Sequence, residues 1–233
     1  MNAVEKRNLL AKEVLKPMLK AAGFKVNKLN WWKELEDGYL FISMQNSRFN
    51  SETLGCCFWF HFSASRKDDI RDTIEKQWIY NQADDIREDA FLPHLGYLSP
   101  NRTSRGYQID GYKNHQPIDT PIEEVFAQVK NDFDIYIMPR IMHIQSVMEF
   151  YQLKEMLKKN YDAKENLLLR YYGIMHSLCC SDSNLPHAMQ IQKDFSLTAE
   201  EIRAHYDWLE TIAQNSSFPN LDATAFIEKA LSM

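Results

Sequence analysis

The stretch from Thr53 to Ser65, T-L-G-C-C-F-W-F-H-F-S-A-S, carries the clearest strand pattern of the chain. Its even-numbered positions are small or apolar and include Phe58, Phe60 and Phe62. Because successive side chains of a strand point to opposite faces of the sheet, these positions predict a core face. The odd-numbered positions mix aromatic and polar residues, which indicates a second face that is only partly covered: Cys57, Trp59, His61 and Ser63.

A second strand with the same alternation is predicted just upstream. Its two sets of side chains are Leu40, Ile42 and Met44 on one face and Phe41, Ser43 and Gln45 on the other. If Tyr39, Phe41 and Gln45 share a face with Trp59 and His61, the sheet presents an aromatic surface with a few polar groups. Such a surface suits a small molecule, a peptide or a flipped base. The alternative is that C-terminal helices cover this face, so that Trp59 is core and His61 is a buried, hydrogen-bonded histidine.

Helices are predicted before and after these strands. An amphipathic helix spans residues 3–22, with a kink expected at Pro17 and an end at Gly23. A further helix is expected over residues 68–92 and a short strand over 107–109. The remaining apolar periodicity predicts helices near 121–138, 140–159, 163–180, 186–194, 199–214 and 222–232. The first of these is expected to stop or kink at Pro139.

Four patterns have the cap-x-x-Glu spacing of helix starts: Thr120 with Glu123, Ser146 with Glu149, Asp162 with Glu165, and Thr198 with Glu201. Together these signals predict an α+β fold, with an antiparallel sheet of about four or five strands and packed helices. We expect this domain to occupy residues 1–155. An all-helical C-terminal extension is expected to follow it in residues 156–233.

The composition is that of an ordinary globular protein. Of the 233 residues 45% are hydrophobic and 25% are charged, and the net charge is -5. The acidic balance argues against nucleic acid as a partner, because a phosphate backbone is bound by clustered cations. The N-terminus has no apolar leader and no run of apolar residues is long enough to span a bilayer, so we expect a cytoplasmic protein without membrane contact. The adjacent pairs Cys56-Cys57 and Cys179-Cys180 indicate apolar packing in a reducing compartment.

A turn-rich segment after the strands gathers residues that could bind an anion. His94, Tyr97, Arg102 and Arg105 lie close together in the sequence, and arginine commonly binds carboxylate or phosphate groups. A solvated loop is the alternative. The seven histidines of the chain are dispersed without the spacing of a metal site, so we expect neither a metal nor another cofactor.

An acidic run lies within the helix expected over 68–92, and it comprises Asp84, Asp85, Glu88 and Asp89. Charged residues at this spacing are typical of a solvated helix face. The same face could present negative charge to a basic partner protein.

Four short motifs occur in the N-terminal two thirds of the chain: Leu15-Lys16-Pro17, Gly23-Phe24-Lys25, M-Q-N-S-R-F-N at 44–50 and H-L-G-Y-L at 94–98. With them, residues 5–155 resemble a widespread bacterial domain family of unknown function. The resemblance implies a small α+β domain with an antiparallel sheet, and it implies no activity. The positions that match the family pattern are Gln45, Ser47, Asn50 and Gly96, where strand-exit and turn chemistry is as good an explanation as a binding role. The strand that usually follows the G-x-L segment is represented only by residues 105–109.

The motifs of dinucleotide, phosphate-loop, serine hydrolase and zinc protease sites are absent from the sequence. We therefore expect a non-enzymatic binding or protein-interaction protein of the inhibitor or immunity type, with a protein partner or a small molecule as its ligand. The alternative is an enzyme acting on a small molecule or a nucleotide, with His61, His94, Arg102 and Arg105 lining one pocket. A cleft that places either histidine within hydrogen-bond distance of a carboxylate would favour the enzyme.

Overall fold

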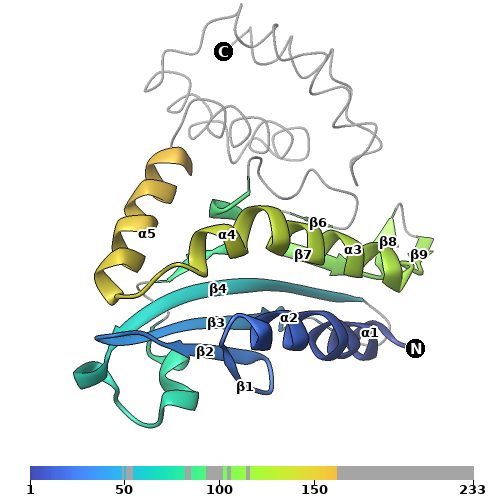
Figure 1. Ribbon diagram of the computed structural model, residues 1–233. Coiled ribbons are helices and arrows are strands. Elements are labelled where there is room, and N and C mark those ends of the chain that lie inside the picture. Colours follow the sequence, from blue (N-terminus) through green and yellow to red (C-terminus); the bar gives the residue numbers. More distant parts are fainter. Residues whose placement is uncertain are drawn as a thin grey trace, which may run out of the picture.

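The computed structural model describes residues 1–48, 50, 55–81, 85–92, 102–103, 106–113 and 116–161. Its centre is an antiparallel sheet in the order β1-β2-β3-β4-β7-β6, and β5 also pairs with β4 (Figure 1). The strands are β1 (Lys25–Asn27), β2 (Asn30–Glu34), β3 (Gly38–Asn46), β4 (Cys56–Arg66), β5 (Ile86–Arg87), β6 (Arg102–Thr103) and β7 (Gly106–Ile109). A separate hairpin joins β8 (Gly111–Lys113) to β9 (Gln116–Ile118).

The predicted α+β class with an antiparallel sheet is confirmed. The sheet has more strands than the four or five expected, because several of them are only two or three residues long and leave little trace in a sequence pattern. The helices expected after about residue 162 lie outside the described residues. The division between residues 1–155 and 156–233 therefore stays a prediction.

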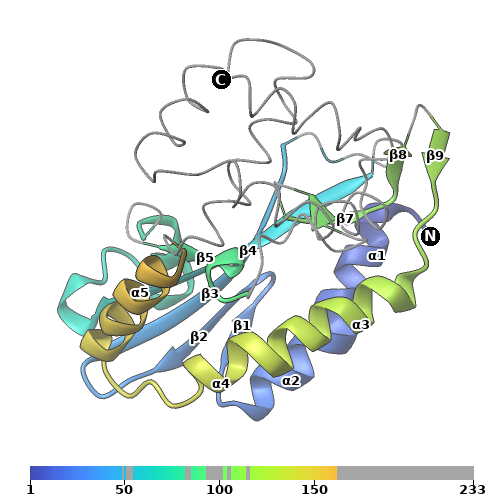
Figure 2. The same cartoon turned by 90° about the horizontal axis from the view of Figure 1, so that it is seen from above.

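The helices cover one face of this sheet. The first group is α1 (Ala3–Leu10), a π-helical turn η1 (Ala11–Leu15) and α2 (Lys16–Ala21); the second is α3 (Ile122–Asp132), a π-helical turn η6 (Phe133–Ile137) and α4 (Met138–Ile141). Figure 2 shows the two groups running alongside each other, with α5 (Val147–Tyr161) at the other end of the sheet. The buried side chains of all these helices belong to one apolar core with the even-numbered face of β3 and β4.

Prolines account for the π-helical turns. Pro17 lies in α2 directly after η1, and Pro139 lies in α4 directly after η6. A proline has no N–H to donate and its ring clashes with the carbonyl four residues earlier, so the wider turn accommodates it without ending the helix. The kinks expected at both prolines take this form. Gly23, with φ +88°, follows the end of α2 as expected.

The core face that the phenylalanines of the central strand predict is confirmed. Phe58, Phe60 and Phe62 have no exposed surface. The ring of Phe60 lies 4.9 Å from that of Phe133 in an edge-to-face arrangement, and the ring of Phe58 stacks on Tyr107 at 5.4 Å. Aromatic pairs with this geometry stabilise a core by more than the burial of their area alone. Residues of η6 and β7 therefore hold β4 against the helices.

The helix predicted over 68–92 is wrong. This segment forms the short 3-10 helices η2 (Lys67–Asp69), η3 (Ile74–Ile79) and η4 (Glu88–Ala90), with β5 between the last two. The main chain of Ile86–Arg87 pairs with His61 and Phe62 of β4, and this pairing is incompatible with a continuous helix. A tertiary pairing overrides the local helical preference here.

The capping box predicted at Thr120 is also wrong, and the patterns that begin at Asp162 and Thr198 lie outside the described residues. The Thr120 hydroxyl accepts the backbone N–H of Asp110 and does not cap α3, which begins without a side-chain cap. The Ser146 hydroxyl does accept the N–H of Glu149, as predicted for the start of α5. Thr120 is diverted because its own N–H also donates to Asp110, which forms a closed pair between the end of β7 and the start of α3.

A buried lysine fastens α1 to this closed pair. The Lys6 ammonium donates to Asp110 at 2.7 Å, to Asp119 at 2.5 Å and to the main-chain carbonyl of Thr120 at 3.0 Å. Burial lowers the pKa of Lys6, but its hydrogen bonds to the two carboxylates outweigh burial and the pKa is raised overall. Lys6 lowers the pKa of Asp119 in turn. We refer to Lys6, Asp110, Asp119 and Thr120 as the Lys6 clasp.

Candidate functional site

The strand register places the predicted site residues of β3 and β4 on one face. Tyr39 pairs with Ser65, Phe41 with Ser63, Ser43 with His61, and Gln45 with Trp59. Directly paired residues of antiparallel strands have their side chains on the same face, so the shared face expected from the sequence is confirmed. Whether these residues bind a ligand stays a prediction.

Within the described residues, this polar face is covered by the segment that follows β4. Gln77 of η3 is buried at 2% exposure, and β5 runs along the edge of β4 beside His61. Phe41 is buried at 2% exposure, whereas Trp59 and His61 are only partly exposed. The aromatic surface is therefore no open platform, and the residues that cover it belong to the segment predicted as a helix.

Trp59, His61 and Asp85 form a chain of contacts on this face. The indole Nε1–H of Trp59 donates to His61 Nε2 at 2.6 Å. On the other side of the ring, His61 Nδ1 lies in close contact with Asp85 Oδ2, in a geometry that is not aligned as a regular hydrogen bond. A nitrogen that accepts a hydrogen bond carries no proton, so the neutral ring holds its proton on Nδ1, facing the carboxylate. The exposed fractions are 17% for the His61 side chain and 13% for Asp85.

The acidic run expected on a solvated helix face lies partly inside the protein. Besides Asp85, Glu88 is fully buried, and its Oε2 accepts the backbone N–H of Phe60 at 2.8 Å. Glu88 thus occupies the edge of β4 between the residues that pair with β5 and those that pair with β7. The prediction of a solvated acidic face is wrong for these two residues, because the segment folds back onto β4. Arg87 places its guanidinium carbon 5.7 Å from the ring centre of Trp59.

The second predicted group, in the turn-rich segment, is only partly placed. The backbone of Arg102 lies in β6 and pairs with Tyr107 of β7. His94, Tyr97 and Arg105 lie outside the described residues. The idea that they share a pocket with His61 stays a prediction.

Asn50, which matches the family pattern, has a structural role. Its side-chain amide donates to the Cys57 carbonyl and its side-chain oxygen accepts the Cys57 N–H, both at 2.8 Å. It also lies 3.2 Å from Cys56 Sγ. Cys56 is buried, and burial raises the pKa of its thiol to about 11. Asn50 therefore fixes the start of β4, and strand-exit chemistry accounts for its presence.

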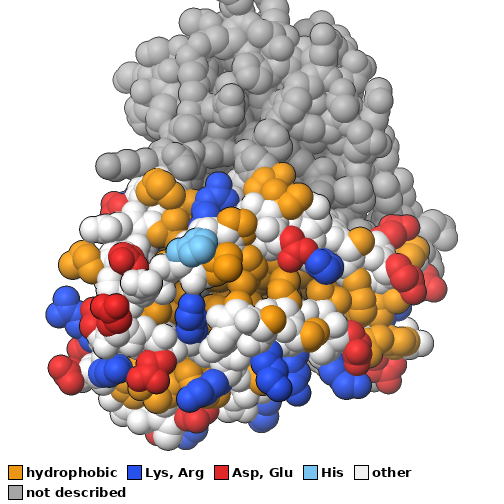
Figure 3. Space-filling view, viewed as in Figure 1, with side chains coloured by type: hydrophobic (Ala, Val, Ile, Leu, Met, Phe, Trp, Pro, Cys, Tyr) orange, Lys and Arg blue, Asp and Glu red, His pale blue; other side chains and the backbone are white. Residues whose placement is uncertain are grey.

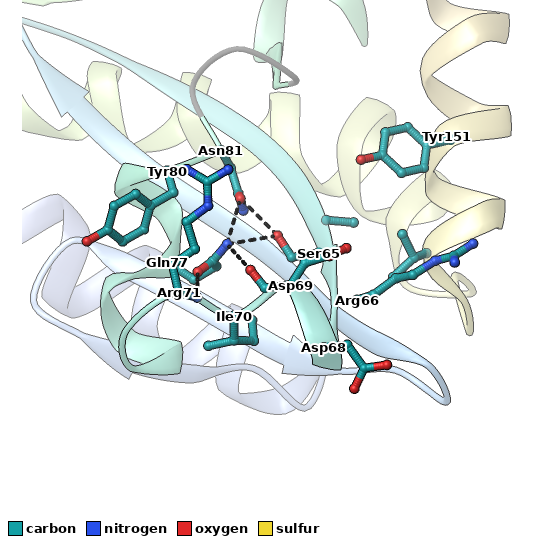
Figure 4. A pocket seen from close by; sticks show the side chains of 12 residues that line it. Ser65, Arg66, Asp68, Asp69, Ile70, Arg71, Gln77, Tyr80, Asn81 and Tyr151 are labelled. Carbon is teal, nitrogen blue, oxygen red and sulfur yellow. Dashed lines mark hydrogen bonds between the residues drawn. The ribbon is translucent and has the colours of Figure 1, made fainter.

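The structure adds a pocket that the sequence did not indicate, and Figure 4 shows it from close by. Its volume is about 440 Å³, within the range of small-molecule sites. It lies at the C-terminal end of β4, between η2 and η3 on one side and α5 on the other. The lining residues are Ala64, Ser65, Arg66, Asp68, Asp69, Ile70, Arg71, Gln77, Tyr80, Asn81, Val147 and Tyr151.

The floor of this pocket is a closed network of uncharged side chains. The Ser65 hydroxyl donates to Asn81 Oδ1 at 2.8 Å, and the Asn81 amide donates to the Ser63 hydroxyl at 3.1 Å. The Gln77 amide donates to the main-chain oxygen of Asp69 at 3.2 Å and also lies 3.3 Å from Asn81 Oδ1. All four side chains of the network are buried. The network therefore satisfies its own polar groups and holds η3 rigidly against β4.

The rim of the pocket carries four charged side chains that have no ionic partner among the described residues. Arg66 and Arg71 are positive and Asp68 and Asp69 are negative, and no ion pair joins any of them to another residue in the part of the chain that the structure describes. The Arg71 guanidinium instead lies over the ring of Tyr80, with 5.6 Å between its central carbon and the ring centre. An exposed charge without an ionic partner is surrounded by water. When such charges stand around a hollow, they are available to a ligand that enters it.

No predicted site residue lines this pocket, and a local pattern gave little hint of it. Gln77 and Asn81 stand four residues apart, and buried polar residues at this spacing look like one polar side of an amphipathic helix. Only the pairing of η3 with Ser63 and Ser65 reveals their role. Serines at the end of the predicted strand, on its less apolar face, were the one available signal.

The side of the molecule on which α2 and α4 lie is seen in Figure 3. Figure 3 shows apolar side chains there over and between α2 and α4, with scattered charges around them. No helix in the described part of the chain is long and apolar enough to cross a membrane. The same residues contain no group of three or more His, Cys, Asp and Glu side chains that could hold a metal ion.

Comparisons of the chain with protein-family models, with curated proteins and with solved structures found no match. The resemblance of residues 5–155 to a bacterial domain family of unknown function is therefore still a prediction. The geometry of the site is the basis for any statement about function.

Proposed function

We propose that the protein is a non-enzymatic binding protein whose pocket at the end of β4 holds a small polar ligand. One observation carries the proposal. The polar side chains of the pocket floor hydrogen-bond to one another and form a rigid surface, and around it stand charged side chains that have no ionic partner in the described part of the chain. A preformed hollow with a few convergent polar groups is the usual form of a small-molecule site. A floor that does not rearrange on binding also favours affinity.

The chemistry of the pocket supports binding rather than catalysis. Ser65 is the one serine among the lining residues, and its proton is directed at the amide oxygen of Asn81. An amide oxygen is too weak a base to activate a hydroxyl nucleophile. Neither His61 nor Asp85 lines the pocket. A bound molecule would thus meet the charged side chains of the rim, and the lining residues include neither a histidine nor a hydroxyl held by a base.

The test is a thermal-shift screen against amino acids, sugars, nucleotides and organic acids, followed by calorimetry on each hit. Binding to the native state raises the melting temperature by mass action. The variant Ile70→Trp fills the pocket from its rim without removing a charge. Its matched control is Ile79→Trp, at an exposed position of η3 that does not line the pocket.

We expect the shift caused by a hit to disappear in Ile70→Trp and to persist in Ile79→Trp. An equal shift in both variants would place binding elsewhere and refute this pocket as the site. If no small molecule shifts the melting temperature, the ligand of a binding protein has to be another protein, as the inhibitor or immunity type requires. Affinity capture from the native cell, with Ile70→Trp beside the unmodified chain, would then decide.

An enzyme is the second candidate function, and the contact between His61 and Asp85 favours it. A carboxylate that orients a histidine is a recurrent part of general-base sites. Here the other ring nitrogen is occupied by Trp59, so the base would act only after the indole moved away. Under the binding proposal, His61→Gln leaves ligand affinity unchanged. Turnover of an ester or phosphate-ester substrate that disappears in His61→Gln would instead establish the enzyme.

A further inference from the structure

We infer that the ligand of this pocket is a small zwitterion, a free amino acid or a short peptide with both termini. The inference rests on the proposed binding function and names the class of ligand. It follows from the signs of the charges around the pocket, from the unused donors of one arginine and from the position of one aspartate.

The rim has equal numbers of positive and negative groups. Arg66 and Arg71 supply the cations, and Asp68 and Asp69 supply the carboxylates. These four side chains lie within a few residues of one another, yet they form no ion pair among themselves. A ligand with a single charge would be attracted by one pair and repelled by the other. A ligand with separated opposite charges is attracted by both.

Arg71 is available to hold the carboxylate. The central carbon of its guanidinium lies over the Tyr80 ring, 5.6 Å from the ring centre. This cation–π contact does not require the N–H donors of the guanidinium to be used on another polar group. None of these N–H groups donates to another described residue. A guanidinium whose donors are not used within the described residues suits the bidentate binding of a carboxylate.

Asp69 is placed to meet the ammonium group. Its main-chain oxygen accepts from Gln77, so the residue is tied to the rigid floor, and Figure 4 shows it beside the hydrogen-bonded cluster. The Asp68 side chain points away from that cluster in the same view. Of the two carboxylates, Asp69 is therefore assigned to the ligand. Arg71 and Asp69 lie on either side of Ile70, which explains why filling that position should block the site.

The experiment is a calorimetric titration with four matched series. The first contains the free amino acids, the second their N-acetyl derivatives without the ammonium, the third their amides without the carboxylate, and the fourth plain dicarboxylates such as succinate. We expect binding only in the first series. Arg71→Gln and Asp69→Asn are each expected to weaken it at least about tenfold, the loss of one charge-assisted hydrogen-bonded contact.

The control variants are Lys76→Gln and Asp72→Asn. These two residues form an exposed ion pair on the same segment and do not line the pocket, so their loss should leave the affinity unchanged. An affinity that falls equally in these controls would mean that general charge, and not the pocket, is responsible. That result would overturn the inference.

The remaining outcomes separate the ligand class from the function. If the N-acetyl compounds, the amides or the dicarboxylates bind as tightly as the free amino acids, the zwitterion is refuted. The binding function then stands provided that Ile70→Trp abolishes this binding. If no compound of the four series binds, the zwitterion is refuted as well, and the sugars and nucleotides of the wider screen decide the function. Binding that Ile70→Trp leaves intact refutes both.

Discussion

Replacing Lys6 by methionine should destabilise the protein by about 3 kcal/mol, the lower end of the range for removing one partner of a buried ion pair. Lys6 is 6% exposed and makes all three contacts of the Lys6 clasp. Its loss leaves the carboxylate of Asp110, with a side chain only 18% exposed, without its cation. It also removes the donor to the Thr120 carbonyl. Asp119 is 94% exposed and is rehydrated easily, so it adds little to the loss.

The assay is urea unfolding followed by tryptophan fluorescence, with Lys12→Met as the matched control. Lys12 pairs with Glu13 on the same helical segment, but its side chain is 74% exposed. We expect this control to lose less than about 1 kcal/mol, as exposed ion pairs do. A value for Lys6→Met that lies within about 1 kcal/mol of the unmodified chain would show that the clasp does not stabilise the fold.

The Lys6 clasp also predicts how the stability of the protein depends on pH: its contribution is lost at high pH and at low pH. The pKa of Lys6 is raised from its ordinary 10.5, so its contribution is present below pH 10.5 and is lost as the pH rises through the higher folded value. The pKa of Asp119 is lowered from 3.8, so its contribution is present above pH 3.8 and is lost as the pH falls through the lower folded value. Lys6→Met should therefore lose less stability than the unmodified chain at both extremes. An identical pH profile for the two proteins would contradict this.

Three further predictions test the core and the start of β4. Phe133→Ala should cost about 3–5 kcal/mol in urea unfolding by leaving a cavity beside the phenylalanines of β4, whereas Ile135→Ala, exposed in the same π-helical turn, should change stability by less than about 0.5 kcal/mol. Asn50→Ala should cost about 1–3 kcal/mol because the N–H of Cys57 loses the Asn50 oxygen and its C=O keeps only the Ser47 N–H of its two donors; Asn50→Asp, which keeps the acceptor, should cost less, and equal losses would refute this account. Cys56, with a thiol pKa of about 11, should resist alkylation at pH 8 in the native protein and react on unfolding; peptide mass spectrometry that finds it modified first would refute its burial.

Most of the fold could be predicted because its signals are local. The alternation of Phe58, Phe60 and Phe62 depends only on the two-residue repeat of a strand, and the kinks at Pro17 and Pro139 depend only on the missing N–H and the ring. These properties belong to the residues themselves. They hold whatever the rest of the chain does, and the structure has them where the sequence places them.

The failures arose where a distant partner decided the outcome. Thr120 has the spacing of a helix cap, but Asp110 takes its hydroxyl and its N–H. Asp85 and Glu88 have the spacing of a solvated helix face, but pairing of their segment with β4 brings one against His61 and the other against the N–H of Phe60. A local pattern cannot register such a competition.

By itself, the sequence determined the α+β class, the central strand with its apolar and mixed faces, the first helix and the core phenylalanines. Side-chain periodicity and backbone chemistry depend only on residues close together in the chain, so these features can be predicted from a single sequence. The tertiary structure alone decided the pocket. Ser65 and Asn81 are 16 residues apart in the sequence and form a hydrogen bond, and no sequence pattern predicts that η3 packs on β4. It also decided that Arg71 and Asp69 line a hollow and have no ionic partner among the described residues, because whether a charge is paired depends on which segments fold against it.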